Sequence, residues 1–334
     1  MALKRLIKAS LLRCQILQTV GRALPSSVAI LRYHSVQKNP YDCANTIGYD
    51  ITHSADELDA HMRLVRERFV PITLDDILQC VEHQQALPRR AVAVTFDDGY
   101  LDNYEVAAPI LARYGVRAAF YVSVGWINSS AVPWFCRLRH GMFSTRMQQW
   151  DGGRNIGIQK LNNERDRTKA FLAGCYACAT LTGDDQELFL RSMETQLEVE
   201  EIGAGRRLMM NWDELRQLQG AGHIVGSHTV THPNVAQIDE ELVFREMSDA
   251  KTTLEENLGR TIEHFSYPAP CLQPHWTEAT IAIARNVGYR TAVTSMRGSA
   301  RSQHDPHCLP RLVCSRDVQQ LRWDIESSFL GRLA

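Results

Sequence analysis

The sequence predicts an α/β protein built around a parallel sheet or barrel. Short apolar, β-branched runs at residues 28–35, 91–96 and 117–123 are typical of buried parallel strands. They alternate with segments whose apolar residues recur at helical spacing, and such alternation packs as βαβ units around one sheet. Polar residues follow where several of these runs end. Catalytic groups of α/β folds lie at this edge of the sheet.

Length, charge and cysteine content narrow the class of protein. The 334 residues, 44% of them apolar, suffice for one large domain or two small ones, and the net charge of -1 predicts no nucleic-acid partner. Nine cysteines, an odd number spread along the chain, favour a reducing, cytoplasmic location over a disulfide scaffold. Cys175 and Cys178 are interpreted as core residues, with a metal or redox role as the alternative.

The first 25 residues are basic and contain no acidic residue. Charges interrupt this stretch too often for a transmembrane span. Its apolar residues fall mostly on one side of a helical wheel, so residues 1–25 are predicted to form a basic amphipathic segment, ended by Pro25. Peripheral contact with the inner membrane surface and packing against the rest of the protein are equal alternatives.

The first predicted strand, residues 28–35, delivers His34 to a loop. A histidine after an apolar strand is more often structural than catalytic, and the residues alone favour that interpretation. Ser54 with Glu57 forms the pattern of a capping box at the start of a helix, and Thr73 starts a second helix.

Asp97 and Asp98 stand side by side where the run 91–96 ends. Two neighbouring carboxylates in a half-buried cleft repel each other, and a metal ion would relieve this repulsion. An Asp-Asp-Gly turn without a further role is the alternative. Asn103 is expected to cap a helix over residues 103–113.

A second cluster of polar residues follows the apolar run near residue 224. It contains His228 and His232, whose i, i+4 spacing brings two imidazoles together if the loop coils by one turn. Two histidines and one carboxylate form a facial set of ligands with open positions, as in catalytic metal sites. Together with the Asp pair, these histidines predict a catalytic divalent metal site.

The remaining segments continue the alternation of helices and strands. Residues 239–258 are predicted to form a long helix closed by Gly259, residues 276–286 another helix, residues 288–295 a strand, and the tail from Ser315 a closing helix. The sequence shows no glycine-rich phosphate loop and marks no serine or cysteine nucleophile.

The segments TFDDGY and SHTVTH, taken together, resemble the first two motifs of the polysaccharide deacetylase family. This family is carbohydrate esterase family 4, with the NodB homology domain, and the resemblance extends with gaps from about residue 28 to about residue 315. It implies a distorted (β/α) barrel within residues 26–334. It also implies that Asp97 is the general base and that Asp98, His228 and His232 hold a divalent metal, zinc by default, with cobalt, nickel or manganese also allowed.

Two further segments resemble motifs of the same family. Leu31-Arg32-Tyr33-His34 is similar to the Leu-x-Tyr-His motif of a permuted branch, which implies that His34 is the general acid. Residues 264–270 resemble the third motif, which implies that Tyr267, Pro268 and the backbone amide of Ala269 border the oxyanion. The arginine that orients the base in that motif is missing here. Arg311 is expected either to replace it or to form a surface salt bridge.

Residues 126–210 interrupt the alternation and are predicted to be a helical insertion. Ordinary packing is the favoured role of its aromatic residues, and stacking against a sugar is the alternative. These aromatic residues are Trp134, Phe135, Trp150 and, at the far edge, Trp212.

The sequence therefore predicts a metal-dependent hydrolase that removes N-acetyl groups from amino sugars of an exopolysaccharide or a lipid-linked glycan. One alternative is deformylation or deacylation of another small amide. Departures from the family pattern at Ser266, Ala269 and Pro270 leave a second alternative open, a metal- and glycan-binding protein without turnover. Asp97 argues against this second alternative, because a pure binder needs no base.

Overall fold

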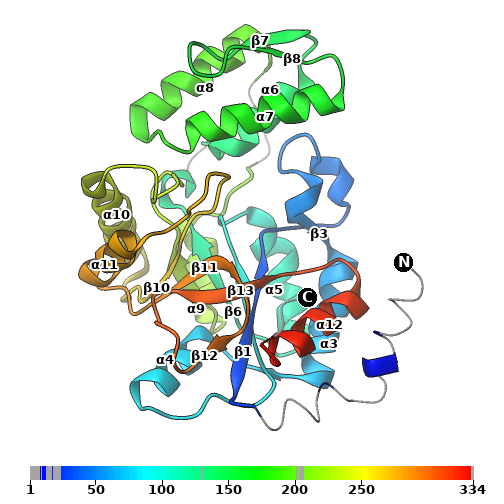
Figure 1. Cartoon of the computed structure of the whole chain (residues 1–334), viewed down its shortest axis with the longest axis vertical. Helices are drawn as coiled ribbons and strands as arrows, with labels where there is room; N and C mark the ends of the chain where they lie inside the picture. Colours follow the sequence, from blue (N-terminus) through cyan, green and yellow to red (C-terminus); the bar gives the residue numbers. More distant parts are fainter. Residues whose placement is uncertain are drawn as a thin grey trace.

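Seven parallel strands form a closed barrel in the part of the chain that the computed structural model describes (Figure 1). This part comprises residues 8, 10–12, 17, 24–128, 131–200, 202 and 207–331. Around the barrel the strands follow the order β1, β13, β11, β10, β9, β6 and β5, and β5 pairs with β1 to close the ring. The prediction of a distorted (β/α) barrel is confirmed. The strands are β1 (Ser27–Tyr33), β5 (Ala91–Phe96), β6 (Ala118–Val122), β9 (Ile224–Ser227), β10 (His264–Ser266), β11 (Thr291–Arg297) and β13 (Leu309–Val313).

The first strand of the barrel, β1, pairs in parallel with both β5 and β13. Its last pair with β5 joins Tyr33 to Phe96, and the backbone N–H of Asp97 donates to the Tyr33 carbonyl over 3.0 Å. His34 and Asp97 therefore follow two paired residues directly and leave the sheet at the same edge.

Helices and short strands complete the barrel. The capping box predicted at Ser54 and the helix start predicted at Thr73 are confirmed at the N-caps of α3 and α4, and Thr73 also forms a capping box, with Asp76. The helices around the barrel are α3 (Ala55–Arg68), α4 (Leu74–Glu82), α5 (Ala108–Arg113), α9 (Trp212–Gly220), α10 (Glu240–Leu258), α11 (Glu278–Val287) and α12 (Val318–Ser328). The short strands are β2 (Ser35–Gln37), β3 (Thr52–Ser54), β4 (Val70–Pro71) and β12 (Ala300–Arg301).

Successive side chains of the barrel strands pack on opposite faces of the sheet. In β1, Ala29 and Leu31 pack with residues of the surrounding helices in an outer core. Val28 and Ile30 pack instead with Ala93 of β5 in a second cluster, which lies inside the barrel. This alternation determines which side chains near the strand ends face the interior.

Residues 126–210 form a largely helical insertion, as predicted. In Figure 1 its elements, drawn mainly in green, lie together beyond one end of the barrel. They form a core of their own, in which Cys175 and Cys178 are buried, so the interpretation of these cysteines as core residues is confirmed. The domain boundaries stay a prediction. The insertion contains α6 (Trp134–Ser144), α7 (Glu164–Cys178), α8 (Gly183–Leu197) and an unpredicted hairpin of β7 (Gln149–Asp151) and β8 (Ile158–Lys160).

The prediction that Asn103 caps a helix is wrong. Asp102 already has helical backbone angles, and a π-helical segment, η3 (Asn103–Ala107), continues into α5. The Asn103 side chain instead donates to the backbone carbonyl of His34 over 2.7 Å. Its amide is therefore used to hold a loop rather than to start a helix.

Most of the predicted amphipathic segment, residues 1–25, lies outside the described residues. Where it is described, it contacts α12: Lys8 Nζ donates to Gln320 Oε1 over 3.0 Å, and Arg322 donates to the Leu12 carbonyl over 3.2 Å. These contacts favour packing against the protein, and membrane contact stays a prediction. No helix among the described residues is long and apolar enough to cross a membrane.

Candidate active site

The loops after the carboxyl ends of β1, β5, β9 and β10 border a cavity of about 260 Å³. Carboxyl ends of parallel strands are where catalytic groups are expected in α/β barrels. The insertion supplies a largely apolar wall that includes Trp134, Phe135, Phe171 and Leu172. The polar lining comprises Arg32, His34, Asp50, Asp97, Asp98, Arg139, His228 and His232.

Asp98, His228 and His232 converge in this cavity as predicted. Asp98 Oδ1 lies 3.5 Å from His228 Nε2 and 3.4 Å from His232 Nε2, and all three side chains are buried. Burial alone would raise the pKa of Asp98, but the two imidazoles hold it well below its ordinary value. These three residues form a compact set of one oxygen and two nitrogen donors.

The donor set fits a divalent metal ion. Ligands about 2.1 Å from a tetrahedral ion are about 3.4 Å apart, which matches the distances to Asp98. His228 Nδ1–H donates to the Ser266 carbonyl over 2.6 Å, so its Nε2 carries a lone pair toward Asp98. Asp98 and His232 also have φ values of 76° and 58°, a left-handed conformation that non-glycine residues adopt at a cost. Such strain is common where a functional site dictates the backbone.

The loop that carries the histidines is held by Glu246 of α10. Its buried carboxylate accepts hydrogen bonds from the backbone N–H groups of Val230 and Thr231, both over 2.8 Å, and from the Thr231 hydroxyl over 2.6 Å. The His232 N–H in turn donates to Thr229 Oγ1 over 3.0 Å. These bonds produce the single coil that the i, i+4 spacing requires.

Replacement of Glu246 by glutamine is expected to weaken metal binding by about 10-fold to 100-fold, the usual effect of losing a group that orients a ligand. Glutamine removes the negative charge that faces the two backbone N–H groups, and its amide nitrogen cannot accept from the Thr231 hydroxyl, so the coil loosens and His232 loses its orientation. Competition with a chromophoric zinc chelator measures the dissociation constant. Glu241→Gln, an exposed position on the same helix, is the matched control. An unchanged constant in Glu246→Gln would show that the coil holds without its carboxylate.

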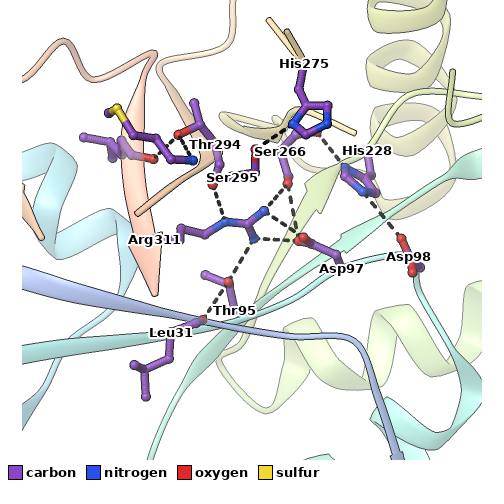
Figure 2. Close-up of polar contacts among 12 residues, drawn as sticks. Leu31, Thr95, Asp97, Asp98, His228, Ser266, His275, Thr294, Ser295 and Arg311 are labelled. Carbon is purple, nitrogen blue, oxygen red and sulfur yellow. Dashed lines mark hydrogen bonds and ion pairs between the residues drawn. The ribbon is translucent and has the colours of Figure 1, made fainter. Parts of the chain in front are cut away.

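Asp97 forms a buried, bidentate ion pair with Arg311 (Figure 2). Arg311 Nη1 donates to Asp97 Oδ1 over 2.8 Å and Nη2 to Oδ2 over 2.7 Å, while Nε donates to the Thr294 carbonyl. Each of the two residues is 2% exposed, so the alternative of a surface salt bridge is wrong. Burial alone would raise the pKa of Asp97, but Arg311 lowers it below its ordinary value. Asp97 is therefore ionised and oriented.

His34 lines the cavity beside the two aspartates. Burial lowers its pKa to about 4, and the charges of Asp98 and Asp97 offset this only in part. Two hydrogen bonds hold the loop that carries His34: Asn103 donates to the His34 carbonyl, and Asp102 accepts from Ser35 Oγ over 2.6 Å. Burial raises the pKa of Asp102 to about 6 despite such hydrogen bonds.

The predicted third motif is only partly at the cavity. Ala269 lines it, together with Pro270 and Cys271. Tyr267 and Pro268 are not among its lining residues, because the Tyr267 ring packs in the outer core and its hydroxyl donates to the His307 carbonyl over 3.1 Å. Any contribution of Tyr267 to the site is therefore through the backbone it anchors.

Sequence reasoning missed the roles of Ser266 and Glu246. Ser266 Oγ accepts from Arg311 over 3.1 Å and donates to Asp97 over 3.3 Å, so a residue that departs from the family pattern contacts both members of this ion pair. The signal for Glu246 was a carboxylate on the apolar face of a helix, between Val243 and Ala250. Of the aromatic residues, Trp134 and Phe135 line the cavity and Trp150 packs in the core of the insertion.

The fold and the site together define an α/β barrel that has a buried, ionised carboxylate beside a donor set suited to a metal ion. The family model for polysaccharide deacetylase matches residues 84–159 and 188–292. These residues make up more than half of the chain, so the protein belongs to the polysaccharide deacetylase family, whose members are hydrolases that act on carbohydrate amides.

Known proteins of similar sequence and structure agree with this family. "Putative polysaccharide deacetylase YxkH" of Bacillus subtilis is 19% identical over 87% of this chain and 72% of its own length. The deacetylase PplD of Streptococcus pyogenes, solved in complex with acetate, is 18% identical with a TM-score of 0.58, over 93% of this chain and 100% of its own. IcaB of Ammonifex degensii has the same identity and TM-score, over 90% of this chain and 97% of its own.

Proposed function

We propose that this protein is a divalent-metal-dependent deacetylase of N-acetylated amino sugars in a polysaccharide or a lipid-linked glycan. The observation that carries the proposal is the buried Asp97–Arg311 pair directly beside the donor set of Asp98, His228 and His232. An ionised carboxylate held next to a metal site is suited to remove a proton from water. The deacetylase PplD, which shares this fold, supports the same reaction.

The chain supplies distinct groups for each part of the reaction. A divalent ion held by Asp98, His228 and His232, with zinc, cobalt, nickel or manganese as candidates, supplies Lewis acidity and lowers the pKa of water. Asp97 accepts the proton of the attacking water, because Arg311 keeps it ionised and fixes both of its oxygens. The backbone N–H of Ala269, which lines the cavity, is the donor that we assign to the developing oxyanion.

His34 is the acid that we assign to the departing nitrogen. An amine leaves only after it gains a proton, so the site requires a group of this kind. Burial holds His34 neutral in the resting site. Negative charge that develops on the carbonyl oxygen during attack favours the protonated imidazole, so His34 takes up a proton from solvent at this stage and transfers it to the leaving nitrogen.

The aromatic wall of the cavity suits a sugar ring. Trp134 and Phe135 are part of it, and Trp134 Nε1 donates to the His232 carbonyl over 3.2 Å. This contact couples the wall to a metal ligand. A protein that only binds metal and glycan needs neither an oriented base nor its buried arginine, which argues for turnover over binding alone.

Acetate release from N-acetylglucosamine oligomers by zinc-loaded protein is the direct test. Wild type is expected to release acetate, and Asp97→Asn and His34→Ala are each expected to lower the rate by about 100-fold or more, because each removes one group of the acid–base pair. Metal content is measured in parallel and should be unchanged in both variants.

The variants separate the assignments. Full activity in His34→Ala would remove the acid assignment and leave the deacetylase intact. If zinc-loaded wild type binds the oligomers and releases nothing, while formyl or other acyl derivatives react, the alternative of another small amide is correct. Binding without any turnover would identify a glycan-binding protein.

A further inference from the structure

Arg32 faces the active-site cavity, and no carboxylate of the described residues forms an ion pair with its guanidinium. It lies between Leu31 and Tyr33, whose side chains both pack in the outer core, so the alternation of β1 directs Arg32 to the barrel interior. It lines the same cavity as the catalytic groups. Its Nε is buried and has no hydrogen-bond partner among the described residues, and no ion pair is formed by its guanidinium within that part of the chain.

Most of the other charged groups of the cavity have partners. Arg311 satisfies both oxygens of Asp97, and Asp98 faces the two histidines. Arg139, which also lines the cavity, donates to the Ala44 carbonyl, and its guanidinium lies 4.6 Å from the Phe143 ring centre and 5.6 Å from the Phe171 ring centre. Among the described residues, Arg32 is thus the lining cation whose guanidinium forms neither a hydrogen bond nor an ion pair, and the charges of Asp97 and Asp98 act on it without direct contact. A divalent ion on Asp98 would make the cavity more positive still.

An uncompensated guanidinium in a cavity indicates a missing anionic partner. A polar group removed from water without a hydrogen bond is costly, and a charged one more so. The planar guanidinium matches the two oxygens of a carboxylate or phosphate in a bidentate contact. A neutral acetamido sugar offers hydroxyl groups but no charge, so it would leave Arg32 uncompensated.

The position of Arg32 relates such an anion to the reaction. Arg32 and His34 are two residues apart on an extended segment, so they face the same side at a spacing of about 6.6 Å. His34 is assigned to the departing nitrogen. An anionic group bound to Arg32 would therefore be a substituent of the sugar whose nitrogen departs, or part of the linkage between this sugar and the next one.

We propose that Arg32 binds an anionic group, a carboxylate or a phosphate, which the substrate carries close to the acetamido group that is hydrolysed. The inference rests on the proposed function and narrows its substrate class to acidic amino sugars or sugar phosphates.

The test compares matched ligands and variants. The ligands are N-acetylglucosaminuronic acid, N-acetylglucosamine 1-phosphate and neutral methyl N-acetylglucosaminide, and the variants are Arg32→Met, Arg32→Lys and, as an exposed control, Arg66→Met. Equilibrium binding to the metal-free protein is measured by calorimetry, and acetate release by the zinc-loaded protein gives kcat and KM. Thermal unfolding of each variant confirms that it is folded.

Wild type and Arg66→Met are expected to bind at least one anionic ligand about 10-fold to 100-fold more tightly than the neutral one, as a charged hydrogen bond would produce. Arg32→Met should lose this preference through a higher KM for the anionic ligand, with little change for the neutral one. Arg32→Lys should keep part of it. Which anion is preferred distinguishes a carboxylate from a phosphate.

Two results would overturn the inference: no preference in wild type, or a preference that persists in Arg32→Met. Either result, with acetate release retained, leaves the proposed function standing. If acetate is released from no ligand but the preference for an anion is present and depends on Arg32, the proposed function fails and the anion site remains.

Discussion

Replacement of Asp98 by alanine is expected to abolish tight metal binding and to lower acetate release by about 10⁴-fold or more. Asp98 supplies the only carboxylate of the donor set formed with His228 and His232 among the described residues. Its loss removes the charge that attracts a divalent ion, and with it several kcal/mol of transition-state stabilisation, where about 1.4 kcal/mol corresponds to tenfold. Metal content after dialysis and the rate of acetate release are the two measurements.

Asp75→Asn is the control for this experiment. Asp75 is an exposed carboxylate whose Oδ1 lies 2.7 Å from His264 Nε2, and with Glu263 these residues form a second group that could hold an ion. We expect Asp75→Asn to keep both metal and activity. A protein that keeps its metal in Asp98→Ala and loses it in Asp75→Asn would place the ion at the second group.

Replacement of Arg311 by methionine is expected to lower the free energy of unfolding by about 3–5 kcal/mol. Removing one partner of a buried ion pair leaves the other charge uncompensated, and Asp97 has no second cation in contact with it among the described residues. Its pKa should then rise, because burial is no longer opposed by the guanidinium. Urea unfolding and the pH dependence of kcat measure the two effects.

The sign of the pH effect follows from the role of Asp97. With Arg311 present, the Asp97 carboxylate is ionised well below neutral pH. Without Arg311, its ionisation requires a higher pH, so the pH profile of kcat should move to higher pH. The double variant Asp97→Asn/Arg311→Met carries no buried charge at this place and should recover part of the lost stability. Equal stability of Arg311→Met and wild type would show that the pair contributes little to folding.

Local patterns in the sequence were sufficient for much of the fold. The strand before Asp97, the capping box at Ser54, the helix start at Thr73 and the helix end at Gly259 depend on neighbouring residues, and all were predicted correctly. The helix start at Asn103 was not, because the Asn103 amide is used by a loop 69 positions away in the sequence. Capping propensities describe neighbouring residues only, so they do not reveal a hydrogen-bond partner that is distant in the sequence.

Long-range pairing also limited what could be said of the site. The donor set of Asp98, His228 and His232 was predicted because residue type and spacing constrain metal ligands strongly. Whether Arg311 contacts Asp97 depends on the register of β13 against β11 and β1, which no local pattern encodes. The orientation of Tyr267 away from the cavity depends on the same sheet, because β10 alternates its side chains between the two faces.

In a closed barrel, strands that are far apart in the sequence can be neighbours in space. β1 has β5 on one side and β13 on the other, so the first and last barrel strands along the chain are neighbours. The position next to β5, the strand that precedes Asp97, can therefore be occupied by the first or by the last barrel strand of a sequence. A histidine that follows such a strand leaves the sheet at the same edge as Asp97 in either case, so a circularly rearranged sequence can form the same arrangement of residues.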